Sequence, residues 1–498
     1  MIIRDWLLCY DEYEPLPCQS PCTLYDVLYQ HHKIPDPFYG MNERSLRFLA
    51  DKDCTFLAFF TVEDAVFERD YIELIFHGLD TLCSIYLNHR LLGRVKNMHR
   101  RYLYEVKHLL QPGENCLRLE FQSPTRYFAK QQAKHYLYMN DGDTLPGAAH
   151  LRKAMYQSGW DWGPTLPDMG IFRDVELRAF DTDRLDSYLI RQIHEDKEVQ
   201  LEIEVTTARN SQAFAVVTID GQSVPLRDGF GRISIPNPRL WWVRGYGEQP
   251  LYDMDIELFL EDRLLDSLHT RIGLRTLTVS TQADPDGSGK EFCFVNNGVK
   301  IFSMGANLIP LDNLLGRVTS QRWEEIVLQA LDGNFNTLRV WGGGYYPDDC
   351  FFEFCDEHGI LVWQDFMVAC ANIYLTEEMK EEFRQEITDN LLRFRHHACL
   401  GILVGNNEME DMIINAGTQN TQLVRLDYLQ LYEHLMPELC EKLAPDIFYW
   451  PSSPSSGGGF DDPGNPLKGD SHYWGDILKS IKSKEVRRRS MMSRSGTF

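Results

Sequence analysis

Long apolar runs are missing from this chain. No stretch of its 498 residues approaches the roughly 20 consecutive apolar residues that a membrane-spanning helix needs. The first residues, MIIRDWLLCYDEYEPLP, hold one short apolar patch that Asp5 interrupts, which is not the pattern of a secretory signal. We therefore expect neither export nor a membrane partner.

Basic charge is also scarce. Lys and Arg total 50 against 73 for Asp and Glu, which gives a formal net charge of −23. A surface of this sign repels phosphate backbones, so we expect no nucleic-acid partner. A neutral substrate would feel little of this field.

The twelve cysteines lack a pattern. They form no C-x-x-C zinc pair and no disulfide framework, and several lie within apolar runs, such as Cys83, Cys116 and Cys399. Reduced thiols and a cytoplasmic location are therefore predicted.

What is present is typical of a large globular protein with several domains. Apolar residues make up 43% and aromatic residues 12% of the chain. Short strand patterns bounded by turn residues dominate residues 54–125 and continue to about 180. They include a hairpin with its turn at Asn88–Arg90, and together they predict an antiparallel β-sandwich over residues 1–182.

A second group of strands follows in residues 183–283. The segments with alternating apolar residues are DSYLIRQIHE, VQLEIEVTTA, AFAVVTID, YDMDIELFL and LHTRIGLRTLTV. Alternating strands over roughly 95 residues fit an immunoglobulin-like β-sandwich.

The pattern changes near residue 295 to strands that alternate with helices. Apolar strands are predicted near 301, 337, 360, 401 and 447, and GDSHYW at 469–474 could begin a sixth. Between them lie three predicted helices, TSQRWEEIVLQALDGNF with its cap at Thr319 or Ser320, DDCFFEFCDEHG, and TEEMKEEFRQEITDNLLRFRHH. This alternation indicates parallel β/α units over residues 284–476.

Polar groups gather where these strands end, which is where a (β/α)₈ barrel carries its chemistry. The side chains at these ends are Asn307, Arg339, Trp341, Gln364, Asp365, Asn406, Asn407 and Glu408. The stretch LVGNNEMED at 403–411 is the most unusual, because it closes an apolar strand with two amides directly before a carboxylate.

At this point the chain resembles the β-mannosidases of glycoside hydrolase family two. The motifs run in the family's order from about residue 15 to 476, and they are IPDPFYGMNE, GWDWGP, LWWVRGYGEQPLYD, GANLIP, LRVWGGG, ILVWQDFM, GNNE, YWPSSPSSGGG and GDSHYW. GNNE and GWDWGP favour the mannosidase branch over galactosidase or glucuronidase relatives. The resemblance implies a galactose-binding-like jelly roll, an immunoglobulin-like sandwich and a TIM barrel, with no cofactor.

The resemblance also implies a retaining mechanism, in which two carboxylates about 5–5.5 Å apart flank the anomeric carbon. Glu408 falls at the position of the acid/base residue. Asn407 resembles the residue that hydrogen-bonds the 2-hydroxyl of the sugar, and Trp341 an aromatic of the sugar pocket.

Three further positions carry over from the family. Asp161, between two tryptophans, resembles the aspartate that binds hydroxyls at the far side of the sugar, and Tyr473 and Trp474 resemble residues of strand six. We interpret Trp363 and Asp365 as core and supporting residues. A turn at Asp161, and core packing for Trp341, are the structural alternatives.

Other site types are not supported by the sequence. WGGGYY and SSGGGFDDPG lack the lysine and glycine spacing of a phosphate loop. His396, His397 and Cys399 have no further ligands nearby in the sequence, and adjacent histidines are expected to point apart, so we predict no metal site.

The last residues depart from the family. Residues 477–498 contain seven Lys or Arg and one acid, Glu485, where a strand seven with the nucleophile glutamate is expected. A solvated basic tail and a membrane-surface helix are two interpretations. We favour a third, loss of the reading frame after about residue 476, which leaves an incomplete barrel without its nucleophile and predicts negligible β-mannosidase activity for the 498-residue chain.

Three functions stay open from the sequence. The leading hypothesis is an exo-acting β-mannosidase that removes terminal β-linked mannose from oligosaccharides. The second is a non-enzymatic fragment that at most binds sugar, and the third is a related glycosidase with another sugar preference.

Overall fold

The computed structural model describes residues 1–139, 144–415 and 421–472. The chain forms two compact units. Unit 1 comprises Met1–Thr182, Pro310–Thr319 and Ala371–Asp389, and unit 2 comprises Asp183–Ile309, Ser320–Cys370 and Asn390–Phe498. Among the described residues, no helix is both long and apolar enough to cross a membrane.

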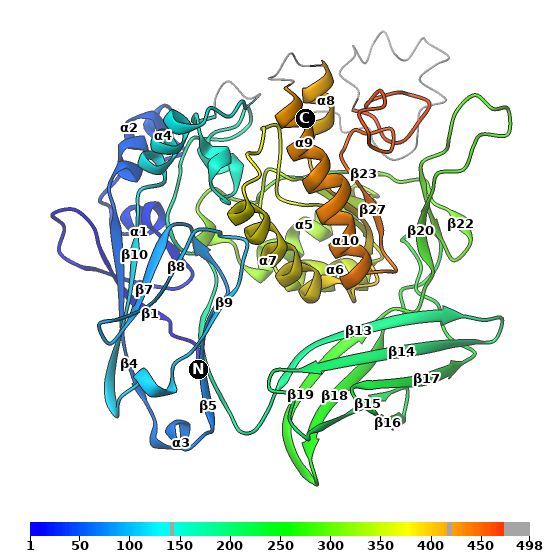
Figure 1. The fold of residues 1–498 in the computed structure, drawn as a ribbon, viewed down its shortest axis with the longest axis horizontal. Coiled ribbons are helices and arrows are strands. Elements are labelled where there is room, and N and C mark those ends of the chain that lie inside the picture. The colour runs from blue at the N-terminus through cyan, green and yellow to red at the C-terminus, as the bar shows by residue number, and fades with distance from the viewer. Residues whose placement is uncertain (140–143, 416–420, 473–498) are drawn as a thin grey trace. The chain divides into compact units, whose positions relative to one another are not determined.

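Unit 1 is built on antiparallel sheets (Figure 1). Its largest sheet has the order β2-β1-β4-β10-β7-β8. These strands are β1 Asp5–Cys9, β2 Leu16–Gln19, β4 Cys54–Val62, β7 Cys83–Leu87, β8 Arg90–Val95 and β10 Gly113–Phe121. Two smaller sheets have the orders β12-β5-β9 and β3-β11-β6. Their strands are β3 Cys22–Thr23, β5 Tyr71–Phe76, β6 Leu79–Asp80, β9 Tyr102–Glu105, β11 Gly170–Ile171 and β12 Val175–Phe180.

The strands of unit 1 bury one face in a common apolar core. Phe56, Ile85 and Leu119 from the large sheet and Leu74 and Phe76 from β5 belong to the same buried cluster. Short helices border the sheets, and they are α1 Leu24–Gln30, α2 Asn42–Leu46, α3 Asp64–Phe67 and α4 Pro124–Lys134. The predicted antiparallel sandwich is confirmed.

The predicted hairpin is confirmed at the predicted turn. β7 and β8 pair antiparallel, with Leu87 opposite Arg90. Asn88 and His89 between them have φ angles of 47° and 67°. Two left-handed residues in a two-residue loop match the right-handed twist of the flanking strands, which is why Asn is favoured there.

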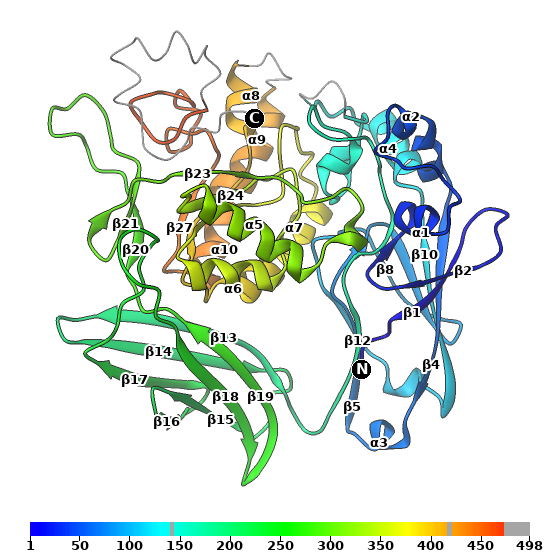
Figure 2. The same cartoon turned by 180° about the vertical axis from the view of Figure 1, so that it is seen from behind.

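Unit 2 begins with two facing antiparallel sheets, β13-β14-β17 and β16-β15-β18-β19 (Figures 1 and 2). Their strands are β13 Leu185–His194, β14 Glu198–Thr207, β15 Phe214–Ile219, β16 Gln222–Pro225, β17 Phe230–Pro236, β18 Tyr252–Leu260 and β19 Arg263–Ile272. Alternate residues such as Leu201, Ile203, Met254 and Ile256 form one buried cluster. The period of two in the sequence therefore produced the expected sandwich.

A parallel sheet of order β23-β24-β25-β26-β27 follows a small hairpin sheet. The parallel strands are β23 Gly305–Leu308, β24 Thr337–Val340, β25 Leu361–Asp365, β26 Leu400–Val404 and β27 Phe448–Trp450, and the hairpin sheet contains β20 Leu277–Ser280, β21 Cys293–Asn296 and β22 Val299–Lys300. β24, β25 and β26 are buried at every position, as strands covered on both faces must be.

Helices connect the parallel strands. They are α5 Ser320–Asp332, α6 Asp349–His358, α7 Glu377–Phe394, α8 Met409–Asn415, α9 Gln422–Tyr428 and α10 Met436–Leu443, with a π-helical segment at Leu429–Leu435. Figure 2 shows α5 and α6 side by side in front of the strands. The first three helices are those predicted from the sequence, although α5 begins at Ser320 and the first strand at Gly305, four residues later than the residue-301 estimate.

The predicted sixth strand stays a prediction. Residues 469–472 are described and form no named strand, and Asp470 makes an isolated antiparallel bridge with Ser455. The rest of the motif, including Tyr473 and Trp474, lies outside the described residues.

Candidate active site

The carboxyl ends of the parallel strands converge on the segment that follows β26. Backbone pairing continues beyond the strands, because Asn407 N donates to Val368 O at 2.9 Å and Cys370 N donates to Asn407 O at 3.0 Å. On the other side, Glu408 N donates to Ser453 O at 2.8 Å. The amides and the carboxylate of GNNE are thus held between the extensions of β25 and β27.

Asn406 and Asn407 have different roles. Asn406 is fully buried, and its Oδ1 accepts from Met409 N at 3.0 Å and from Ser452 Oγ at 2.7 Å. Its Nδ2 donates to Pro451 O at 3.0 Å. Asn406 therefore caps the start of α8 and ties the loop to the end of β27, which is a structural task.

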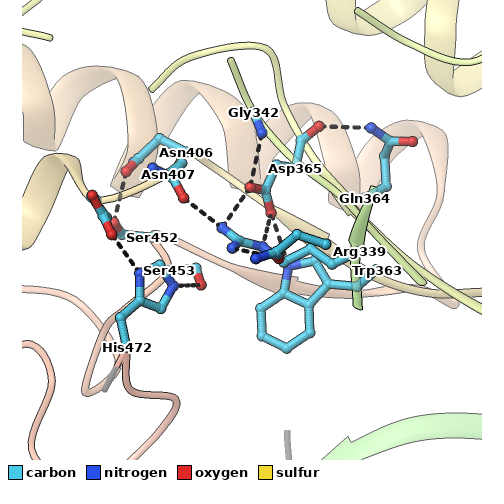
Figure 3. Close-up of polar contacts among 12 residues, drawn as sticks. Arg339, Gly342, Trp363, Gln364, Asp365, Asn406, Asn407, Ser452, Ser453 and His472 are labelled. Atoms are coloured by element: carbon cyan, nitrogen blue, oxygen red, sulfur yellow. Dashed lines mark hydrogen bonds and ion pairs between the residues drawn. The ribbon is translucent and has the colours of Figure 1, made fainter. Parts of the chain in front are cut away.

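Asn407 is oriented by an arginine from β24. Arg339 Nη2 donates to Asn407 Oδ1 at 2.9 Å, and Arg339 Nη1 donates to Asn307 Oδ1 at 3.2 Å (Figure 3). With its oxygen engaged, the amide of Asn407 presents Nδ2 as a donor, which contacts Cys370 Sγ at 3.3 Å. A fixed amide donor beside a carboxylic acid suits a hydroxyl-bearing ligand.

Arg339 is itself fixed by Asp365 at the end of β25. Its Nη2 lies 2.8 Å from Asp365 Oδ2, and Trp363 Nε1 and Gly342 N donate to the same carboxylate at 2.9 Å and 3.1 Å. Burial raises the pKa of Asp365, against the opposing charge of Arg339. Asp365 and the fully buried Trp363 thus have the supporting positions predicted from the sequence.

Glu408 occupies a strained position. Its φ of 63° lies in the left-handed region, which non-glycine residues adopt rarely and which costs about 1 kcal/mol or more. Its side chain is 19% exposed, with Oε1 2.7 Å from His472 Nδ1 and Oε2 3.3 Å from Cys370 Sγ. Such backbone strain, at a residue whose carboxylate is contacted on both oxygens, is typical of functional sites.

The contacts of Glu408 decide its charge. Burial raises the pKa of the carboxyl, but the hydrogen bond and charge of His472, the Cys370 thiol and Arg339 outweigh burial and leave the pKa below its ordinary value. Glu408 is therefore held as a carboxylate in this arrangement.

Trp341 is buried at the end of β24 and packs on a glycine turn. A side chain at Gly343 would overlap the Trp341 ring, and one at Gly342 would lie 2.6 Å from Val368 O. These two glycines therefore permit close packing of the turn, which explains WGGG without a phosphate-binding role.

The predicted site residues fall into three groups. Asn407 and Glu408 follow β26 and Trp341 follows β24, two strands of the same parallel sheet of unit 2 that β25 separates. Asp161 is exposed in unit 1, in a turn that the Trp160–Gly163 bridge closes, and its role stays a prediction. Tyr473 and Trp474 lie outside the described residues.

Four contacting residues were not assigned from the sequence. They are Cys370, Ser453, Asp470 and His472. Cys370 and His472 contact Glu408 directly, whereas Ser453 contacts His472 and Asp470 contacts Ser453. His472 lies 64 positions from Glu408 in the sequence, and no periodicity connects them. The motifs GDSHYW and YWPSS were the available signals, but they did not say which side chains point inward.

The histidine pair near residue 396 differs from expectation in one respect. The rings of His396 and His397 have centroids 4.2 Å apart, so the prediction that they point apart is wrong. His397 Nδ1 bonds Asp356 Oδ2 at 2.6 Å, which accounts for its orientation. Within the described residues, no group of three or more His, Cys, Asp or Glu side chains could hold a metal ion.

Comparison with known families decides the relationship. Residues 6–173 match the galactose-binding-like domain of glycosyl hydrolase family 2, and residues 185–275 match the family model for glycosyl hydrolases family 2. β-Mannosidase B of Aspergillus flavus is 32% identical over 486 residues, which cover 92% of this chain and 57% of the relative. The chain belongs to glycoside hydrolase family 2.

Solved structures are similar to this chain as well. The β-D-mannosidase of Dictyoglomus thermophilum superposes with a TM-score of 0.89 at 31% identity, covering 98% of this chain and 62% of that one. The exo-chitosanase of Amycolatopsis orientalis, at 17% identity and a TM-score of 0.68 over 92% of this chain and 53% of its own, shares the fold. The resemblance to the β-mannosidases is confirmed, and the chain spans between half and two thirds of the length of these proteins.

Proposed function

We propose that the site after β26 belongs to a retaining exo-β-mannosidase acting on terminal β-linked mannose of oligosaccharides. Glu408 is its acid/base residue, and Asn407 donates to the 2-hydroxyl of the sugar. The observation that carries the proposal is the strained Glu408 beside an Asn407 whose oxygen Arg339 occupies, in a chain similar to β-mannosidases.

We further propose that the five parallel strands are the first part of a (β/α)₈ barrel over residues 284–476. It follows a jelly roll over 1–182 and an immunoglobulin-like domain over 183–283, with a basic segment at 477–498. The strand-end position of Glu408 supports this, because barrel enzymes carry their chemistry at that edge.

The proposed reaction needs a second carboxylate about 5–5.5 Å from the first. Asp365 and Asp470 are described, but each accepts hydrogen bonds from at least three donors. Neither is free to attack an anomeric carbon. The resemblance puts the nucleophile after a sixth strand, and the described residues end at His472.

A second function, sugar binding without cleavage, is favoured by the charge of Glu408. A general acid at neutral pH needs a raised pKa, which a neighbouring ionised nucleophile helps to supply. Here the pKa of Glu408 is lowered, despite burial, by His472 and Arg339.

One experiment separates these functions. Calorimetry with mannose is combined with hydrolysis of 4-nitrophenyl glycosides of mannose, glucose, galactose and glucuronic acid, on the 498-residue chain, on Glu408→Gln and on the control Glu324→Gln, an exposed residue of α5. Any turnover should be fastest with the β-mannoside and fall about 100-fold or more in Glu408→Gln but not in Glu324→Gln.

The outcomes differ for each hypothesis. Mannose binding without turnover supports the sugar-binding function. Preference for another glycoside supports a related glycosidase. Turnover that survives Glu408→Gln contradicts the proposed role of Glu408.

A further inference from the structure

A hydrogen-bonded chain of four side chains ends on the candidate acid. Asp470 Oδ2 accepts from Ser453 Oγ at 2.6 Å, Ser453 Oγ lies 3.0 Å from His472 Nε2, and His472 Nδ1 lies 2.7 Å from Glu408 Oε1. Figure 3 shows Ser453 and His472 in this line. The His472 side chain is 5% exposed, so this chain is largely removed from solvent.

The far end of the chain fixes where the hydrogens lie. Asp470 Oδ1 accepts from Trp450 Nε1 and Ser455 N, both at 2.9 Å, and although burial raises the pKa of this carboxyl, the Trp450 hydrogen bond opposes the rise and favours its charged form. The one hydrogen of Ser453 therefore points to Asp470, and its oxygen faces the imidazole as an acceptor. It follows that His472 carries a hydrogen on Nε2.

Between His472 and Glu408 there is then one shared proton, which can lie on His472 Nδ1 or on Glu408 Oε1. If His472 is doubly protonated, Nδ1 donates to a Glu408 carboxylate. If His472 is neutral with its hydrogen on Nε2, Nδ1 accepts from a protonated Glu408. The two states differ only in the position of one proton along a 2.7 Å contact, and their net charge is the same.

We propose that His472, oriented by Ser453 and Asp470, is a positioning residue that stores the proton which Glu408 delivers to the departing sugar oxygen. The step transfers a proton from His472 Nδ1 to Glu408 Oε1, converts the imidazolium to the neutral ring with its hydrogen on Nε2, and consumes no other reagent. It rests on the proposed acid/base role of Glu408.

Several ionisable groups surround the pair. They are Asp411, Asp470, Asp365, Arg339 and the thiol of Cys370, which contacts Glu408 Oε2 at 3.3 Å. Three of these five are carboxyl groups, and Arg339 is the one permanent cation among them. The hydrogen bond and charge of His472 lower the pKa of Glu408 despite burial, so the histidine that keeps Glu408 ionised is also the adjacent group that can return a proton to it.

The test reads protonation directly and needs no turnover. Carboxyl-¹³C glutamate and ¹⁵N-histidine labels are followed by NMR from pH 3 to 9 in the full chain, in His472→Gln, in Ser453→Ala, and in the control His434→Gln, whose residue is exposed in the π-helical segment. Glu408→Gln and His472→Gln assign the two signals.

The expected results are specific. In His472→Gln the pKa of Glu408 should rise, with a proton affinity increased about tenfold, which is one pKa unit. In Ser453→Ala the neutral ring of His472 should lose its preference for hydrogen on Nε2. His434→Gln should change neither signal.

Two results would overturn the proposal. One is a Glu408 titration that is the same with and without His472, and the other is a neutral ring with its hydrogen on Nδ1. If His472→Gln fails to fold, the ring tautomer in the unchanged chain and in Ser453→Ala still decides. If the Glu408 titration depends on His472 but the chain hydrolyses no glycoside, the proton-storage proposal stands and the proposed function fails. If hydrolysis is lost in Glu408→Gln but the Glu408 titration does not depend on His472, the proposed function stands and the proton-storage proposal fails.

Discussion

At the scale of single residues, the site depends on side chains that hold other side chains. Arg339 contacts the carboxylate of Asp365 and the amide oxygens of Asn407 and Asn307, and it is 8% exposed. A guanidinium can serve several acceptors at fixed angles, whereas an ammonium group cannot. The orientation of Asn407 therefore follows from the identity of Arg339.

Arg339→Lys should consequently weaken sugar binding while keeping the charge. We expect the dissociation constant for mannose, measured by calorimetry, to rise about tenfold or more, because the Asn407 amide loses its fixed orientation. Arg393→Lys, at a partly exposed pair with Asp349, is the control and should bind as the unchanged chain does. Equal affinity in both variants would show that Arg339 does not orient the site.

The sequence predicted the site residues that are adjacent in the chain, but not the residues that reach the site from loops after other strands. Asn407 and Glu408 were identified by their place directly after a predicted strand and by the family resemblance of GNNE. Cys370, Ser453 and His472 come from loops after other strands, and their contacts depend on loop conformations that neither spacing nor periodicity encodes.

At the scale of elements, one buried ion pair ties α7 to the sandwich of unit 1. Arg152 Nη2 lies 2.7 Å from Glu386 Oε1, and Arg152 Nε lies 2.9 Å from Glu386 Oε2. Asn97 Nδ2 adds a bond of 3.0 Å to the same carboxylate, and Glu386 is fully buried. Burial raises the pKa of Glu386, but the charge of Arg152 foremost, together with His99 and the hydrogen bonds from Arg152 and Asn97, holds that pKa below its ordinary value.

Glu386→Gln should be strongly destabilising, because it leaves the Arg152 charge buried without its counter-ion. We expect a loss of about 3–5 kcal/mol in the free energy of unfolding, measured in urea by circular dichroism. Glu378→Gln on the same helix is the matched control, since that side chain is 75% exposed, and it should cost about 1 kcal/mol or less. Similar losses in the two variants would contradict this account.

Regular elements were predictable because they repeat. The period-two strands of both sandwiches and the buried runs of β24, β25 and β26 were read correctly, as were α5, α6 and α7. The two-residue strands β3, β6 and β11 were missed, and so was the pairing of β20, part of which lay in a predicted strand, with β21 and β22. Such short pieces carry no periodicity, and their pairing is decided by partners far along the chain.

At the scale of the whole molecule, two buried carboxyls give the stability a pH dependence of known sign. Burial raises the pKa of Asp168 in unit 1 and of Glu410 in unit 2, each to about 7. Between their unfolded values near 4 and pH 7, the folded state binds more protons than the unfolded state. Their contribution to stability is therefore full below about pH 4 and is lost as the pH rises from about 4 to about 7.

Asp168→Asn should remove one part of this dependence. The amide keeps an acceptor for Tyr25 N and Met169 N, which now bond Asp168 Oδ1 at 3.1 Å and 2.8 Å, but it never ionises. Relative to the unchanged chain, the variant should gain stability as the pH rises from about 4 to about 7, by up to about 1.4 kcal/mol per pH unit. Thermal unfolding at several pH values checks this, and a stability difference that is constant with pH would contradict it.

The order of domains was supplied by the family resemblance more than by local patterns. Strand and helix patterns alone indicated two β-rich parts and a β/α part. They did not identify the sugar or the partner carboxylate. Those belong to the resemblance, and the family assignment rests on the matched family models and relatives.

The central claim is that the strand-end site formed by Asn407 and Glu408 recognises a mannose-configured sugar. Isothermal titration of mannose into the 498-residue chain and into Asn407→Ala tests it most directly, with glucose and galactose as competing sugars. The account predicts that mannose binds in preference to both and that Asn407→Ala weakens this binding about tenfold or more. Absence of mannose binding, or unchanged binding in Asn407→Ala, would contradict it.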